Sequence, residues 1–115
     1  MRRRIALIGL GLLIGAAQRP SDPSAYDQGV AARRAGDHLR ALSLLRQAAA
    51  QEPANADVHL QIGLTHLALG QLDEAETAFR RTLELAPDYA DARIALARLA
   101  QRRGDEAAAL AELEP

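Results

Sequence analysis

The chain has 115 residues, of which 49% are hydrophobic and 25% charged, a balance typical of a folded soluble domain rather than a disordered segment. It contains no cysteine, which excludes a disulfide framework, a thiolate nucleophile and a cysteine-based metal site. All fourteen basic residues are arginine, so a phosphate-binding loop that depends on lysine is also excluded. Only 3% of the residues are aromatic, so we expect a core of small and aliphatic side chains between closely packed helices.

Residues 1–17 differ in composition from the rest of the chain. Three arginines at positions 2–4 precede an uncharged, mostly apolar run over residues 5–17. This run is short for a membrane-spanning helix, which needs roughly 20 apolar residues. It fits the apolar core of a secretory signal peptide, and the small residues before Gln18 supply a cleavage site. We therefore predict a signal peptide or, if it is retained, a short N-terminal membrane anchor; the alternative is a buried N-terminal helix.

An exported protein follows from this interpretation, periplasmic after cleavage or anchored in the inner membrane if the segment stays. No cysteine follows the apolar run, so a bacterial lipoprotein anchor is excluded. Cleavage after Ala17 leaves 14 − 3 = 11 basic against 15 acidic residues, a mildly acidic balance that argues against nucleic acid as a partner. Residues 18–23 contain two prolines and a serine and are typical of a linker.

Residues of like type recur at a spacing of 34 through the rest of the chain, residues 24–115. The recurring sets are Gly36, Gly70 and Gly104; Ala41, Ala75 and Ala109; Leu45, Phe79 and Leu113; Gly29, Gly63 and Ala97; and Pro53 with Pro87. A period between 20 and 50 residues indicates stacked repeats. We place the three copies at residues 22–55, 56–89 and 90–115, the last of them truncated.

The middle copy predicts a helical hairpin. Its first half has apolar or small residues on two helical stripes, which indicates a helix buried on two sides. Gly70 ends this helix and Pro87 ends the next one. Small residues allow two helices to approach closely, so we expect Gly63 and Ala75 at the contact and Phe79 in the wider gap beyond. The predicted helices cover residues 24–35, 38–51, 56–69, 72–85, 90–102 and 105–113.

The middle copy resembles a tetratricopeptide repeat. That pattern has Trp, Leu-Gly and Tyr on the first helix, then Ala, Phe and Pro. The corresponding residues here are His59, Ile62, Gly63, His66, Ala75, Phe79 and Pro87. Histidine at both the Trp and Tyr positions is a departure from the pattern. The resemblance implies an all-α fold, a right-handed superhelix of about three helix-turn-helix repeats with the first helices on the concave face.

Histidines are the first candidates for chemistry. His59 and His66 lie seven residues apart on one predicted helix, about 10.5 Å along its axis, so one metal ion cannot bridge them. We expect both to pack at the aromatic positions of the repeat, and His38 to lie solvated at a turn. Paired zinc-ligand spacing of the HExxH type is absent. We expect no metal and no cofactor.

Acidic residues are the second candidates. Asp73, Glu74 and Glu76 fall with Arg80 on one face of a predicted helix, and Glu76 and Arg80 have the spacing of a weak ion pair. A paired-carboxylate site is conceivable there, but a solvated face is the simpler interpretation. No serine lies in a Gly-x-Ser-x-Gly turn. We therefore predict no catalytic residues and a protein that is not an enzyme.

A binding groove is the remaining functional candidate. The resemblance implies that ligand contacts come from the exposed side of each first helix. The corresponding positions are Tyr26, Val30, Arg33, Leu60, Leu64, Leu67, Ile94, Arg98 and Gln101. We expect an apolar floor edged by arginines, suited to an extended or helical peptide with apolar anchors and some acidic character. In one subclass of the family that this chain resembles, lysine and asparagine at such positions hold the C-terminal carboxylate of a peptide. Neither residue occupies these positions here, so that mode of binding is not expected. The alternative is that the leucines pack against neighbouring repeats.

The sequence thus predicts a non-catalytic interaction scaffold or adaptor of the bacterial cell envelope, with another protein or a peptide as its partner. The alternative is a membrane-tethered structural subunit of a pilus, secretion or cytochrome-maturation assembly. We also expect an uncovered apolar surface around Leu110 and Leu113. It could fray, dock on a partner or support self-association.

Overall fold

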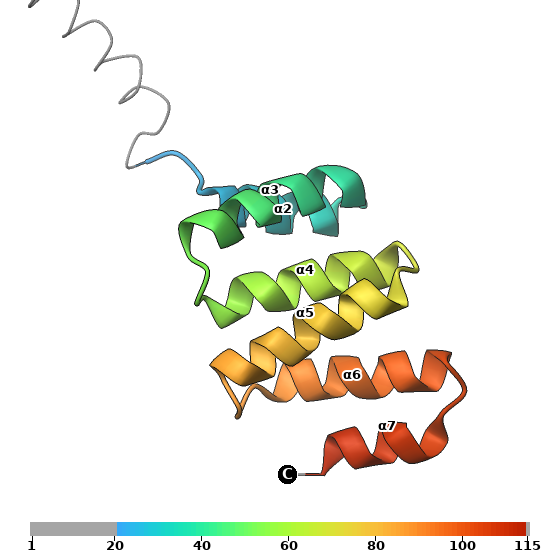
Figure 1. Ribbon diagram of the computed structural model, residues 1–115. Helices are drawn as coiled ribbons and strands as arrows, with labels where there is room; N and C mark the ends of the chain where they lie inside the picture. Colours follow the sequence, from blue (N-terminus) through green and yellow to red (C-terminus); the bar gives the residue numbers. More distant parts are fainter. Residues whose placement is uncertain (1–20, 115) are drawn as a thin grey trace, which may run out of the picture.

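Three helical hairpins stacked in one direction make up the part of the chain that the computed structural model describes, residues 21–114 (Figure 1). The helices are α2 (Ala25–Arg34), α3 (His38–Gln51), α4 (Ala56–Ala68), α5 (Leu72–Leu85), α6 (Ala90–Arg102) and α7 (Glu106–Leu113). Every predicted helix is present, with each end within one residue of its predicted position. The predicted signal peptide and residues 18–20 of the predicted linker lie outside the described residues. Over residues 21–114, no helix combines the length and apolar character needed to cross a membrane.

The helix ends follow from local sequence. Ser24 caps α2 by accepting a hydrogen bond from the Asp27 amide at 3.0 Å, and Asn55 caps α4 by accepting one from the Asp57 amide at 3.0 Å. Asp105 caps α7 by accepting one from the Ala108 amide at 2.9 Å. These short polar side chains satisfy backbone donors that have no partner within the helix.

Glycine closes the turn inside each hairpin. Gly36, Gly70 and Gly104 have φ angles of 85°, 76° and 78°, in the left-handed region that side chains with a Cβ rarely adopt. In the middle turn the amide of Gln71 donates to the carbonyl of His66 at 2.9 Å, which closes the helix end. The 34-residue spacing of glycine therefore reflects three equivalent turns.

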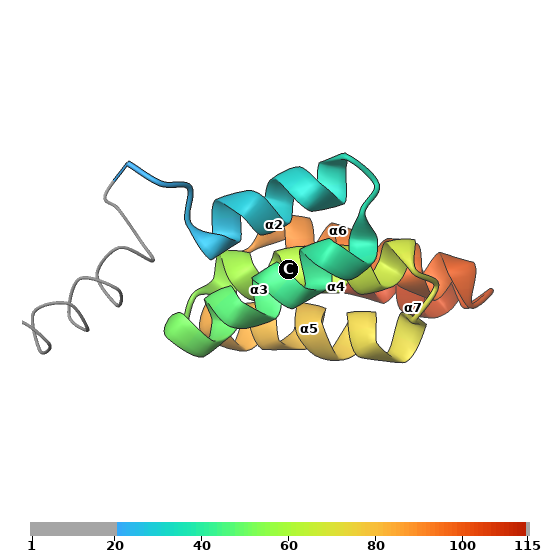
Figure 2. The same cartoon turned by 90° about the horizontal axis from the view of Figure 1, so that it is seen from above.

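First helices of successive hairpins contact each other, α2 with α4 and α4 with α6. The backbones of the second helices α3, α5 and α7 do not approach each other as closely. The stack therefore curves with its first helices on the inner side, as the repeat pattern implied. Seen from above, α2 and α6 lie toward one side of the stack and α5 toward the other (Figure 2).

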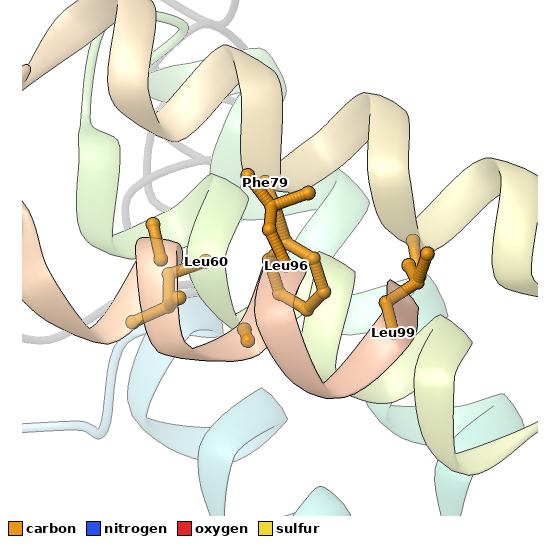
Figure 3. Close-up of a cluster of buried hydrophobic side chains, with 7 residues drawn as sticks. Leu60, Phe79, Leu96 and Leu99 are labelled. Carbon is orange, nitrogen blue, oxygen red and sulfur yellow. The ribbon is translucent and has the colours of Figure 1, made fainter. Parts of the chain in front are cut away.

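The largest core cluster joins the middle and last hairpins (Figure 3). Phe79 of α5 is its largest fully buried side chain, and Leu96 and Leu99 of α6 pack with it. A smaller cluster joins the first hairpin to α4 through Ala25 and Val58. The last hairpin leaves Leu110 and Leu113 65% and 55% exposed, which confirms the predicted apolar surface at these two positions.

The close contact within the middle hairpin differs from the expectation. A Cβ at Gly63 would lie 2.4 Å from Cε1 of Phe79, so the residue facing Gly63 is Phe79 and not Ala75. Gly29 faces Leu45 in the same way in the first hairpin, where a Cβ would lie 2.7 Å from Cγ. The small residue on the first helix thus makes room for the large side chain on the second.

Candidate functional site

A groove runs between α4 and α6 on the inner side of the stack. It consists of two adjoining hollows of about 570 and 280 Å³ that share Leu64, Leu67 and Arg98. The other lining residues are Leu60, Gln61, Ala68, Asp91, Ile94, Ala95, Gln101 and Arg102. We call this surface the inner groove.

Six of the nine predicted binding positions meet in the inner groove. They are the three leucines of α4 together with Ile94, Arg98 and Gln101 of α6. Each leucine of α4 lies opposite the α6 residue that stands 34 positions later in the sequence. The three predicted positions of the first repeat, by contrast, line neither hollow.

Leu60 is less exposed than an open position on the floor of the groove would be. It reaches the inner groove but is only 4% exposed, because it packs in the core cluster with Ala75 and Phe79. The prediction of an open binding position is therefore wrong for Leu60, and the packing alternative holds there. Leu64 and Leu67 are half-buried against the same cluster and keep part of their surface in the groove. Ile94 is 41% exposed, more than the half-buried Leu64 and Leu67.

The first repeat uses its predicted binding residues for internal contacts. Tyr26 is half-buried and packs against Ile62 and the neighbouring core. Burial, followed by the nearby carboxylate of Asp57, raises the pKa of the Tyr26 phenol. Arg33 donates from Nε to Oε1 of Gln61 at 2.8 Å, which ties α2 to α4. Val30 is also half-buried.

Charge is distributed unevenly along the inner groove. Arg98 and Arg102 lie toward one end of α6, and Asp91 lies in its first turn. Arg102 donates from Nη1 to the carbonyl oxygen of Leu67 at 2.8 Å, at the end of α4. Arg98 is exposed and makes no hydrogen bond or ion pair within residues 21–114. Its guanidinium is therefore free to meet an acidic group on a ligand.

A polar contact closes the other end of the groove. Tyr89, the residue before α6, donates its phenolic O–H to Asp57 in the first turn of α4. This hydrogen bond, followed by burial and the negative charge of Asp57, raises the pKa of Tyr89 to about 12. The donor therefore stays protonated at neutral pH, and α4 and α6 are held together at this end.

The lining residues that were not predicted include Gln61 and Asp91. Asp91 had a signal in the sequence, because Asp57 stands 34 residues before it and both lie three residues before a predicted groove position. Gln61 had none, because its role depends on Arg33 of the preceding hairpin reaching it.

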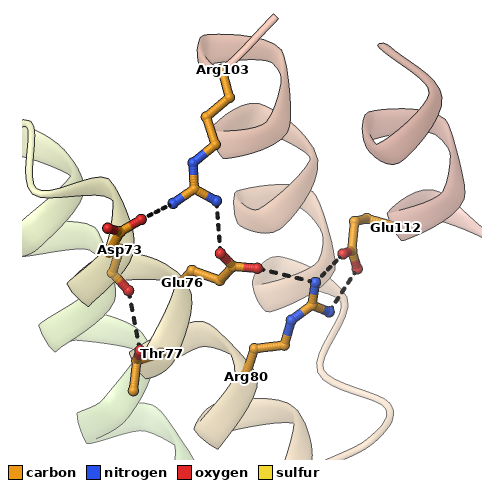
Figure 4. Close-up of polar contacts among 6 residues, drawn as sticks. All are labelled: Asp73, Glu76, Thr77, Arg80, Arg103 and Glu112. Atoms are coloured by element: carbon orange, nitrogen blue, oxygen red, sulfur yellow. Dashed lines mark hydrogen bonds and ion pairs between the residues drawn. The ribbon is translucent and has the colours of Figure 1, made fainter. Parts of the chain in front are cut away.

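The acidic face of α5 is not simply solvated (Figure 4). Arg103, just beyond α6, donates to Asp73 Oδ1 at 2.5 Å and to Glu76 Oε1 at 2.7 Å. Arg80 binds both carboxylate oxygens of Glu112 on α7 and lies 3.4 Å from Glu76 Oε2. The expectation of a purely solvated face is therefore wrong. Arginines and carboxylates on this face form a network of hydrogen bonds and ion pairs that links the middle and last repeats.

The network also perturbs its members electrostatically. The hydrogen bond from Arg103, opposed in part by burial, leaves the pKa of Glu76 below its usual value. The hydrogen bond to Glu112 raises the pKa of Arg80. Glu76 is consequently held by arginines as an ionised group, which disfavours the paired-carboxylate chemistry considered from the sequence.

The three histidines lie in three different environments. His66 is 6% exposed, with Nδ1 2.7 Å from Gln71 Oε1, and His59 places Nε2 2.9 Å from the Pro53 carbonyl. His38, expected to be solvated, is instead half-buried and its Nδ1 is sealed from solvent without a partner among the described residues. Over residues 21–114 no group of three or more His, Cys, Asp or Glu side chains is placed to hold a metal ion.

Comparison with known families gives two overlapping matches. One family model, described as tetratricopeptide repeat, matches residues 32–83, and another with the same description matches residues 60–114. Together they cover residues 32–114, which include most of the first copy and all of the middle one. No curated protein matches the sequence.

Solved structures of MamA are similar in fold. One crystal structure of MamA superimposes with a TM-score of 0.74 at 23% identity, covering 79% of this chain and 55% of that chain. The structure described as MamA MSR-1 C2 gives a TM-score of 0.72 at 27% identity, covering 77% and 51%. The chain thus spans about half of the length of the MamA structures that it matches.

Proposed function

Since the chain belongs to the tetratricopeptide repeat family, we propose that it is a protein–protein interaction scaffold whose inner groove binds a peptide segment of a partner protein. Binding of partner proteins or peptides is the general role that the repeats support. The fold is typical of non-catalytic scaffolds, and the proposal includes no chemical step.

One observation carries the assignment to the inner groove. Partly open apolar side chains, Leu64, Leu67 and Ile94, lie beside the exposed guanidinium of Arg98, which has no partner within residues 21–114. Apolar surface supplies affinity, and a free guanidinium supplies selectivity for a carboxylate. The favoured ligand is a segment with apolar anchors and an acidic residue near Arg98.

The cell envelope is the proposed location. Its support is the sequence of residues 1–17, whose arginines, short apolar run and small residues have the order found in secretory signal peptides. Intact-mass measurement of the protein recovered from a periplasmic fraction tests this. A mass lacking residues 1–17 supports it, and recovery only in the cytoplasm contradicts it.

A displayed library of random peptides tests the groove. Peptides selected on the full chain should be enriched in apolar residues and in Asp or Glu. Arg98→Glu should weaken a selected peptide by about 1–2 kcal/mol, roughly five- to thirtyfold, because it replaces attraction by repulsion. Leu67→Ser should weaken it as well, through lost apolar contact. Titration calorimetry measures each dissociation constant.

Arg46→Glu is the matched control. It makes the same charge reversal at an exposed position of α3, outside the inner groove, and should leave peptide affinity unchanged. Circular dichroism verifies that each variant keeps its helices. If selected peptides bind the Arg98→Glu and Leu67→Ser variants as tightly as the original chain, the inner groove is not the binding site.

A further inference from the structure

A second hollow lies on the opposite face of α4 from the inner groove. Its volume is about 490 Å³, and both of its walls come from the middle hairpin. The lining residues are His59, Ile62 and His66 of α4 and Glu74, Thr77, Ala78, Arg81 and Glu84 of α5. We call it the histidine pocket. It shares no residue with the inner groove, so the two surfaces can be tested independently.

The departure from the repeat pattern falls in this pocket. The pattern places tryptophan and tyrosine at the positions that His59 and His66 occupy. An imidazole fills less space than an indole or a phenol. The pocket therefore opens where the pattern has large aromatic rings, and Ile62 and Ala78 give it apolar walls.

His66 contributes an unused hydrogen-bond acceptor. Its side chain is 6% exposed, and Nδ1 lies 2.7 Å from Oε1 of Gln71. An amide oxygen only accepts, so Nδ1 donates to it, and in the neutral imidazole Nε2 then keeps a free lone pair. Nε2 bonds to no residue in the range 21–114.

Nε2 of His66 also remains accessible. Among the described side chains, the one buried nitrogen or oxygen atom that is sealed from solvent without a partner is Nδ1 of His38. Nε2 of His66 is consequently not sealed from solvent, and His66 lines the histidine pocket. A ligand that supplies a donor can take the place of the water that Nε2 meets there, which gives the modest net gain of one hydrogen bond.

The charged residues at the mouth of the histidine pocket favour a ligand with a basic residue beside the group that donates to Nε2 of His66. Arg81 donates from Nη1 to Glu84 Oε2 at 3.0 Å, so these two charges offset each other. Glu74 is exposed and makes no hydrogen bond or ion pair within the described part of the chain. One carboxylate at the mouth is thus left to attract a cation.

We propose that the histidine pocket binds an aromatic side chain that carries a hydrogen-bond donor, tyrosine or tryptophan, from a partner segment with lysine or arginine beside that residue. The ring packs between Ile62 and Ala78, its O–H or N–H donates to Nε2 of His66, and the basic neighbour approaches Glu74. An aromatic side chain buries about 150–250 Å², which suits it as a single anchor. The protein then holds partner segments on both faces of α4.

Two neutral probes of the same shape test the acceptor. The full chain is titrated with 4-methylphenol and with toluene, and binding is followed by NMR through the backbone amides of α4 and α5. We expect saturable shifts at the histidine pocket and about fivefold tighter binding of 4-methylphenol, because only the phenol donates a hydrogen bond. His66→Phe keeps a ring but removes the acceptor, so the preference for the phenol should disappear.

Two further variants serve as controls. His66→Tyr restores the ring of the repeat pattern, and should fill the pocket and abolish binding of both probes. Arg98→Glu alters the inner groove alone and should change neither probe's affinity, which separates this proposal from the proposed function. The inference is overturned if neither probe gives saturable shifts on α4 and α5, if the shifts map to the inner groove, or if the His66→Phe chain keeps the preference.

A last comparison tests whether Glu74 attracts a basic residue to the mouth of the histidine pocket. The peptide Lys-Tyr-Lys should bind several-fold more tightly than Glu-Tyr-Glu, and Glu74→Gln should reduce that difference. The difference should also shrink at high salt, because exposed charges are screened. Equal binding of the two peptides at low salt would contradict the role given to Glu74.

Discussion

Gly63 has no side chain, and this allows α4 and α5 to approach closely. A Cβ at this position would lie 2.4 and 2.5 Å from Cε1 and Cδ1 of Phe79, closer than real Cβ atoms lie to neighbouring atoms. Phe79 is fully buried and is surrounded by the core cluster, so its ring has little room to move. The sequence identified Gly63 as a contact point but paired it with Ala75, because spacing alone does not show which residue of α5 lies opposite.

Gly63→Ala should lower the thermal midpoint of unfolding by about 4–8 °C. Overpacking costs about 1–3 kcal/mol, and the better helix propensity of alanine offsets up to about 1 kcal/mol of that cost. The remaining loss of about 1 kcal/mol shifts the midpoint of a domain of this size by that amount. Calorimetry measures the midpoint directly.

A double-mutant cycle with Phe79→Leu identifies the cause. The smaller leucine removes the ring that a Cβ at position 63 would meet, so Gly63→Ala should be less damaging in the Phe79→Leu background. Equal costs in both backgrounds would mean that the clash between residues 63 and 79 is not the reason for the destabilisation.

At the scale of elements, the outer helix of the last hairpin is held by little apolar burial and by ion pairs. α7 spans only eight residues, and Ala109 is its one buried residue. Arg80 of α5 reaches Glu112 of α7, while Arg103 at the end of α6 reaches back to α5 (Figure 4). Apolar burial and ion pairs therefore both contribute to holding α7 against the rest of the stack.

Removing the contact between Arg80 and Glu112 should destabilise the chain modestly. A double-mutant cycle of Arg80→Ala and Glu112→Ala should give a coupling of about 0.5–1 kcal/mol, the upper range for partly exposed pairs, measured by urea unfolding. The coupling should fall when the salt concentration is raised, because solvent ions screen the pair.

Arg81→Ala and Glu84→Ala provide the matched control cycle. Its arginine is similarly exposed, but Glu84 is more exposed than Glu112 and the pair lies within α5, so its coupling should be smaller, in the range of about 0.3–0.5 kcal/mol for helix neighbours. A coupling for Arg80 and Glu112 no larger than that of the control pair would show that the network does not help to dock α7.

Over the whole molecule, stability should be highest in the middle of the stack. α4 and α5 pack against each other and against α3 and α6, whereas among the described helices the backbone of α7 lies close to α6 alone and reaches α5 only through the Arg80–Glu112 contact. Stability in stacked repeats depends on contacts between neighbours, so an element with one neighbour opens at lower cost.

Native-state hydrogen exchange measures this distribution. The slowest amides should belong to α4, α5 and α6, and those of α7 should exchange faster through local opening. Exchange of α7 as slow as that of α5 would mean that the chain from residue 21 to residue 114 unfolds as one cooperative unit.

Much of the candidate site could be anticipated from the sequence, and the errors share one cause. The 34-residue spacing correctly placed Leu64 and Leu67 opposite Arg98 and Gln101. It could not show that Leu60, on the same helical stripe, is buried by α6 while Leu64 stays half-open. That difference depends on how closely successive hairpins stack, which no local pattern encodes.

The sequence by itself determined the helices, the turns and the repeat, because these depend on neighbours within a few residues. Glycine tolerates the left-handed turn, Asn55 caps α4, and the apolar stripes require burial. Only the tertiary structure decided which side chains meet across repeats. Arg103 finds Asp73 across 30 residues of chain, and His66 is left with an open acceptor, because both depend on the distance and angle between packed helices.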